Sequence, residues 1–84
     1  MAAVTPNIQF TLLVKIEGRL REFNFRKRSA QLYDVDTADE KGARFQFNWK
    51  EVDGAWEITS LANLPDWIRR NTSSLREKFH EHLL

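Results

Sequence analysis

Residues 15–28 combine basic and aromatic side chains in a way that could bind single-stranded nucleic acid. The stretch holds six basic residues against two acidic ones, a local surplus of +4 in a chain whose net charge is +1. Basic groups attract phosphates, and the interleaved Phe23 and Phe25 could stack on bases. The candidate nucleic-acid-binding residues are Lys15, Arg19, Arg21, Arg26, Lys27 and Arg28. The alternative is a solvated basic strand whose two phenylalanines belong to the core.

Four acidic residues, Asp34, Asp36, Asp39 and Glu40, are close enough in sequence to suggest a calcium loop. The EF-hand pattern needs a ligand at its fifth position and glycine at its sixth. Counted from Asp34, those positions hold Ala38 and Asp39, so the pattern fails. We expect a solvated loop whose charge can pair with the basic stretch, within one molecule or between two.

The remaining residue types give no reactive constellation. His80 and His82 would point about 200° apart on a helix, whereas zinc-binding pairs are spaced i, i+4. With no cysteine, covalent catalysis would need Ser, Thr or Lys beside a base. The serines fall in connectors or near expected helix caps, and the three glycines form no phosphate loop. We therefore predict no enzyme, no catalytic residues, no cofactor and no metal.

The elements that must position these side chains are organised around a hairpin predicted over residues 45–58. Apolar and polar residues alternate at its start, which is the period of a half-buried strand. Asp53-Gly54 supplies two residues that tolerate positive φ, as a type I′ turn requires. With these two residues as the loop, Trp49 lies opposite Ile58. One face then carries the apolar side chains Phe45, Phe47, Trp49, Trp56 and Ile58.

A second hairpin is predicted near the N-terminus, with strands from Ile8 to Ile16 and from Arg19 to about Lys27. Glu17-Gly18 is its two-residue turn. The register pairs apolar residues on one face, Leu12 with Phe23 and Phe10 with Phe25. Nearer the turn apolar residues meet basic ones, Val14 with Arg21 and Ile16 with Arg19. We therefore expect the turn end of this hairpin to overhang the core.

A short third strand is predicted over residues 31–36, followed by the polar loop 36–42. The C-terminal segment is helical, with Asn63 as a candidate cap and Pro65 in the first turn. Either one helix spans 64–83 with a weak middle, or a first helix breaks near 71 and a second starts near 75. The capping-box pattern from Ser74 to Glu77 favours the broken form.

These elements predict one α+β domain, residues 1–84. It comprises a flexible lead-in over 1–6, a four- or five-stranded antiparallel meander sheet within 8–60, and a helical segment over 64–83. The helix should cover the face that bears Phe10, Leu12, Phe23, Phe25, Phe45, Phe47, Trp49 and Ile58. The other face is left to solvent or to a partner.

On that second face we expect a modest apolar patch of Leu13, Leu20 and Leu32. A small sheet with free edges and a spare face commonly self-associates, and a two-fold dimer is the commonest solution. These three leucines are therefore the candidate self-association residues, and we expect a homodimer.

Composition bears on the cellular setting. The first seven residues have no basic and apolar signal pattern, and the longest apolar run is far shorter than the roughly 20 residues that span a bilayer. A small chain without cysteine suits a reducing compartment. We expect a cytoplasmic protein with no membrane partner.

The order of four or five antiparallel strands followed by a C-terminal helix resembles the ββββα units of the whirly, PC4-like and Pur-alpha families, and the chain also resembles small uncharacterised bacterial proteins. The resemblance covers most of the chain but lies in element order alone. It implies single-stranded nucleic-acid binding by dimers or fused repeats. Three interpretations follow: a non-enzymatic interaction module that self-associates, a single-stranded nucleic-acid-binding protein, and a small ligand-binding domain that would need a deep polar pocket.

Overall fold

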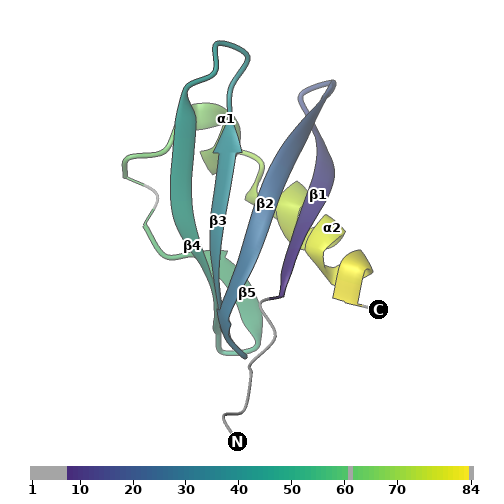
Figure 1. Cartoon of the computed structure of the whole chain (residues 1–84), viewed down its shortest axis with the longest axis vertical. Helices are drawn as coiled ribbons and strands as arrows, with labels where there is room; N and C mark the ends of the chain where they lie inside the picture. The colour runs from purple at the N-terminus through teal and green to yellow at the C-terminus, as the bar shows by residue number, and fades with distance from the viewer. Residues whose placement is uncertain (1–7, 61, 84) are drawn as a thin grey trace, which may run out of the picture.

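The computed structural model describes residues 8–60 and 62–83 (Figure 1). The expected lead-in over residues 1–6 lies outside the described residues. Five strands form one antiparallel sheet, and two helices follow them. The elements are β1 (Gln9–Ile16), β2 (Arg19–Ser29), β3 (Leu32–Ala38), β4 (Arg44–Val52), β5 (Ala55–Ile58), α1 (Asp66–Arg69) and α2 (Thr72–Leu83). Each strand pairs with the next along the chain, which confirms the predicted α+β meander with five strands rather than four.

Both predicted hairpin turns are confirmed. Glu17-Gly18 has φ values of 50° and 85°, and Asp53-Gly54 has φ values of 52° and 83°. Two successive positive φ values are the signature of a type I′ turn, whose twist matches that of the flanking strands. The turns fix the predicted registers, in which Leu12 pairs with Phe23 and Trp49 with Ile58.

The third strand extends two residues beyond the end of the predicted 31–36 segment. Thr37 is buried on the core side at 1% exposure, and its hydroxyl donates a hydrogen bond of 2.7 Å to the carbonyl oxygen of Glu22. This bond ties the end of β3 to β2, so the acidic loop begins later than expected. An irregularity in the β2–β3 register between Lys27 and Ser29 accommodates the residue between them, Arg28.

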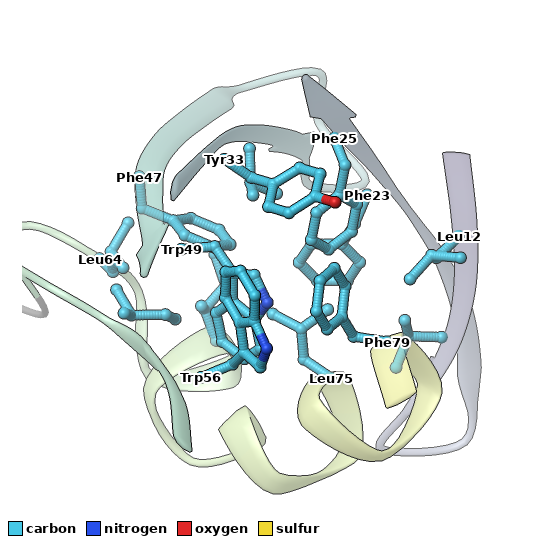
Figure 2. Close-up of a cluster of buried hydrophobic side chains, with 14 of the residues drawn as sticks. Leu12, Phe23, Phe25, Tyr33, Phe47, Trp49, Trp56, Leu64, Leu75 and Phe79 are labelled. Atoms are coloured by element: carbon cyan, nitrogen blue, oxygen red, sulfur yellow. The ribbon is translucent and has the colours of Figure 1, made fainter. Parts of the chain in front are cut away.

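The helices cover one face of the sheet, and the aromatic side chains fill the space between the two layers (Figure 2). Phe79 of α2 is fully buried, with its ring centroid 4.8 Å from that of Trp56 and 5.3 Å from that of Tyr33. Phe23 and Phe25 are also buried, which confirms the prediction that they belong to the core. The buried apolar residues are Leu12, Val14, Ile16, Phe23, Phe25, Tyr33, Val35, Phe47, Trp49, Trp56, Ile58, Leu64, Ile68, Leu75 and Phe79.

The turn end of the first hairpin does not overhang the core, and that prediction was wrong. Val14 and Ile16 are only 2% and 3% exposed. The junction between α1 and α2 contacts this end, because both Arg70 and Asn71 donate hydrogen bonds to the carboxylate of Glu17, at 2.9 and 3.1 Å. A contact across more than fifty residues of sequence thus holds the turn against the helices.

The C-terminal segment is two helices, as the broken form predicts, but their starts differ from the expectation. Pro65, not Asn63, occupies the N-cap position of α1. The second helix begins at Thr72, three residues before the expected start near 75. Asn71 explains the earlier start, because its backbone oxygen accepts the amide of Leu75 at 3.2 Å while its side chain donates to the Trp67 carbonyl at 2.8 Å. Neither described helix has the length and apolar character that a membrane-spanning helix needs.

Candidate interaction surfaces

The side chains divide between two unlike faces of the sheet. The face toward the helices carries the aromatic core, and the opposite face, which we call the open face, carries the alternate residues of each strand. That alternation follows from the period of two in a β-strand, so burial of one set leaves the other set to solvent. Any ligand or partner that binds the sheet itself must therefore meet the open face or a strand edge.

A hollow of about 860 Å³ lies on the open face and extends over β1 to β4. Its lining has four kinds of hydrogen-bonding side chain: amides, a hydroxyl, carboxylates and guanidinium groups. Two hydrogen bonds join side chains of this lining across neighbouring strands. Thr11 donates to Asn24 Oδ1 at 2.7 Å, and Asn48 donates to Asp34 Oδ1 at 2.8 Å. Ion pairs of Arg28 with Asp34 and of Arg44 with Asp36 complete the surface. The polar side chains that line the hollow include Thr11, Asn24, Asp34, Asp36, Gln46 and Asn48.

The six basic residues of the candidate nucleic-acid site do not share one face. Lys15, Arg26 and Arg28 lie on the open face, whereas Arg19, Arg21 and Lys27 occupy the alternate positions of β2 that belong to the helix side. The structure therefore brings together at most half of the predicted set. Phe23 and Phe25, the proposed stacking platforms, are 0% and 1% exposed.

Acidic side chains already bind three of these arginines. Glu40 pairs with both Arg19 and Arg21, and Arg28 pairs with Asp34. The Arg21 guanidinium also lies 4.9 Å from the Trp67 ring centroid, in cation–π geometry. The basic stretch and the acidic segment thus pair in part within one molecule, one of the two arrangements expected from the sequence.

The carboxylate of Asp39 organises the acidic loop from inside. Its Oδ1 accepts hydrogen bonds from the backbone amides of Lys41 and Ala43, at 2.9 and 2.8 Å. Gly42 adopts a φ of 84° to close the turn. Asp39 therefore acts as a turn residue, as Asp commonly does by bonding the backbone two residues ahead.

Two of the three candidate self-association residues come together. Leu13 and Leu20 are diagonal neighbours on the open face, where β1 pairs with β2, and they are 48% and 67% exposed. Leu32 lies near the other end of the sheet, where it pairs with Ser29 and Lys50 and is partly buried. The apolar patch on the open face thus consists of Leu13 on β1 and Leu20 on β2, and Leu32 is separate from it.

The two edges of the sheet differ. The β5 edge is four residues long, and Arg76 of α2 closes it by donating from Nε to the Trp56 carbonyl oxygen at 2.9 Å. The β1 edge is eight residues long, and its alternate residues Gln9, Thr11, Leu13 and Lys15 are all exposed. Proteins commonly cover, twist or shorten edge strands to prevent pairing with another chain. Among the contacts of the described residues, such protection is found at β5.

Sequence reasoning did not find three of these features: the polar hollow, the Arg76 contact and the link from Glu17 to the helix junction. The last two join residues 20 and 53 or more positions apart. No local pattern signals such a contact. Both histidines are exposed, and His82 stacks on Phe10 with ring centroids 4.0 Å apart.

Comparison with known proteins gives no relative: no family model matches the chain, and no match was found among curated proteins or solved structures. The resemblance to ββββα nucleic-acid-binding units therefore stays an expectation based on element order.

Proposed function

We propose that this chain is a small non-enzymatic interaction module that associates with itself as a homodimer. The observation that carries the proposal is the juxtaposition of two exposed leucines, Leu13 and Leu20, with the long outer edge of β1, to which no residue in 8–60 or 62–83 is paired. Apolar side chains beside unpaired backbone groups offer both burial and hydrogen bonds to an added strand. A second copy brings the same features to the same place, which is how a two-fold interface is built.

The distribution of side chains supports a binding role rather than catalysis. The aromatic rings hold the sheet to the helices, and four charged groups of the open face form two ion pairs, Arg28 with Asp34 and Arg44 with Asp36. We also place the module in the cytoplasm, because a small chain without cysteine suits a reducing compartment.

Size-exclusion chromatography with light scattering tests the proposal directly. The native chain is expected to elute with the mass of two chains. Leu13→Lys puts a charge beside the β1 edge and should weaken the dimer about tenfold or more, since 1.4 kcal/mol already corresponds to a factor of ten. Val52→Lys, which alters an exposed residue of similar character (40%) on β4, should leave the mass unchanged. A native chain that stays monomeric at high concentration would refute self-association.

Single-stranded nucleic-acid binding is the second candidate. Arg26 and Lys27 favour it, because both are exposed and neither forms an ion pair with any residue in 8–60 or 62–83. Binding through phosphates should weaken steeply as salt rises, because each contact releases counterions. A gel-shift series with short single strands at low salt is the test, and an absence of retardation at micromolar protein would remove this candidate.

A further inference from the structure

The backbone of β1 presents its free hydrogen-bonding groups at alternate residues. Lys27 donates its amide to the Ile8 carbonyl at 2.9 Å, so the even-numbered residues of this strand are the ones that bond to β2. In an antiparallel pair the intervening residues point their N–H and C=O groups the other way. Those residues are Gln9, Thr11, Leu13 and Lys15, and no described residue pairs with their backbone on that outer side.

We propose that a second copy of the chain adds to this edge, β1 against β1 and antiparallel, with the two-fold axis at Leu12. The proposal rests on the self-association proposed above and specifies its interface. In this register Gln9 lies opposite the partner's Lys15 and Thr11 lies opposite the partner's Leu13. The two five-stranded sheets become one continuous sheet, with the open faces of both copies on the same side.

Hydrogen bonding favours this register over its neighbours. Each pair of outward residues exchanges two N–H···O bonds, so the register with Leu12 on the axis makes about eight bonds between the chains. A slip by two residues in either direction leaves Gln9 or Lys15 without a partner and makes about two bonds fewer. A slip by one residue would place each outward-pointing residue opposite a partner residue whose N–H and C=O groups already bond to its own β2. No ladder of hydrogen bonds between the two chains would then form.

The side chains of the open face agree with the same register. Lys15 is the one charged residue of β1, and it meets an amide rather than the partner's Lys15. Leu13 becomes a diagonal neighbour of the partner's Leu13, just as it already is of Leu20. Leu13 and Leu20 of both copies then form one diagonal across four strands. Contacts along this diagonal bury part of the side chains of Leu13 and Leu20, which are 48% and 67% exposed in the single chain.

The helices leave room for the added strand. In Figure 1, α2 crosses behind β1 and its C-terminal end projects past the edge of the sheet. That end lies over Phe10, whose ring stacks on His82. Because Phe10 pairs with the partner's Val14, the projecting ends of the two helices lie at opposite ends of the paired strands. They cover the new junction from two sides rather than meeting at the axis.

Disulfide trapping tests the register, and the absence of native cysteine makes every cross-link informative. Gln9→Cys and Lys15→Cys are made as separate chains, both at exposed positions. In the proposed register these positions face each other at a Cα separation of about 5.5 Å, within the range of a disulfide. Two copies of either variant alone hold their cysteines about 20 Å apart.

The expected result is a cross-linked dimer from the mixture of the two variants and none from either variant alone under the same oxidation. No cross-link in the mixture, or equal cross-linking of one variant by itself, would overturn the register. These outcomes differ from failure of the proposed function, which light scattering of the native chain shows as a monomer.

Amide exchange of the native chain gives a second test that needs no variant. At high protein concentration the amides of Gln9, Thr11, Leu13 and Lys15 should exchange more slowly than in dilute solution, because each becomes bonded to the partner. The amides of Trp56 and Ile58 at the other edge are the internal control and should not depend on concentration. If the four β1 amides exchange at the same rate at both concentrations, the dimer does not use this edge.

Discussion

Phe79 is the residue on which the two layers of the molecule converge. Its ring is fully buried and lies within 6 Å, centroid to centroid, of the rings of Phe25, Tyr33, Trp49 and Trp56. These neighbours come from four different strands, and Figure 2 shows them around Phe79. Aromatic rings in edge-to-face and offset arrangements add to the free energy of burial.

Phe79→Ala should therefore lower the free energy of unfolding by about 3–5 kcal/mol, the usual effect of removing a buried aromatic ring. Urea denaturation followed by tryptophan fluorescence measures the change. Leu83→Ala, on the same helix but 51% exposed, is the matched control and should change stability by less than about 0.5 kcal/mol. Similar effects from the two substitutions would contradict the position of Phe79 at the centre of the core.

Thr37 makes a second prediction at the level of one residue. Thr37→Val keeps the shape of the side chain but removes the donor to the Glu22 carbonyl, so it should destabilise the protein by about 1–2 kcal/mol. Thr11→Val removes an exposed hydroxyl that bonds Asn24 and should have a much smaller effect. Thermal unfolding of both variants measures the difference. Equal losses of stability in the two variants would show that the buried hydrogen bond of Thr37 stabilises the protein no more than the exposed one of Thr11.

Tyr33 couples stability to alkaline pH. Burial raises the pKa of Tyr33 above its ordinary value of about 10, because desolvation disfavours the charged tyrosinate. The unfolded chain then loses this proton first, so the stabilisation is complete below pH 10 and decreases as the pH rises from there through the folded pKa. Tyr33→Phe should unfold with a shallower loss of stability over that range.

The measurement of this effect is simple because Tyr33 is the single tyrosine of the chain. Ultraviolet absorbance of tyrosinate follows its titration without interference from other tyrosines, in the folded state and in urea. A folded-state midpoint at or below the unfolded one would show that burial does not disfavour the tyrosinate.

At the scale of elements, the strands show how far local patterns determine the structure. The period of two and the two-residue turns specify both hairpins and their registers, since a slip would expose the aromatics. The end of β3 was not predictable in this way. Thr37 lies in a polar segment typical of a loop, and only its hydrogen bond to the Glu22 carbonyl of β2 shows that it belongs to the strand. The covered turn at Glu17 was missed for the same reason, since Arg70 lies 53 residues away.

The candidate surfaces were predictable only in part. The alternation of β1 identified Leu13 as an outward residue, and the hairpin register placed Leu20 of β2 diagonally beside it. Leu32 was grouped with them because its strand was known only as a segment, without its place across the sheet. Likewise the basic residues formed one set in sequence, but the pleat of β2 divides them between two faces.

The unequal edges support a prediction about α2. Arg76→Ala removes the donor to the Trp56 carbonyl, a partly buried hydrogen bond from a charged group, and should lower the free energy of unfolding by about 1–2 kcal/mol. Lys78→Ala, at an exposed position of the same helix, should leave it nearly unchanged. Chemical denaturation compares the two variants, and an equally small effect of both would mean that Arg76 does not stabilise the β5 edge.

At the scale of the whole molecule, an 84-residue chain forms a small domain with a limited hydrophobic core. A domain of this size buries only about two-thirds of the surface of its unfolded chain, so the proposed association would add a meaningful share of the total buried surface. If two chains fold as one dimer, mass action makes the melting temperature depend on protein concentration. A tenfold rise in concentration adds about 1.4 kcal/mol to the dimer, which corresponds to about 3–6 °C for a folding unit of this combined size.

The native chain should therefore melt about 3–6 °C higher for each tenfold increase in concentration. At concentrations below the dissociation constant of its weakened dimer, Leu13→Lys should melt at a temperature that does not change with concentration, because the chain is already monomeric before it unfolds. Val52→Lys should keep the dependence of the native chain, which separates loss of the interface from a general effect of an added lysine. A native melting temperature that is constant across a hundredfold range of concentration would mean that the single chain reaches its full stability alone, and the outer edge of β1 would then have no role in holding the fold together.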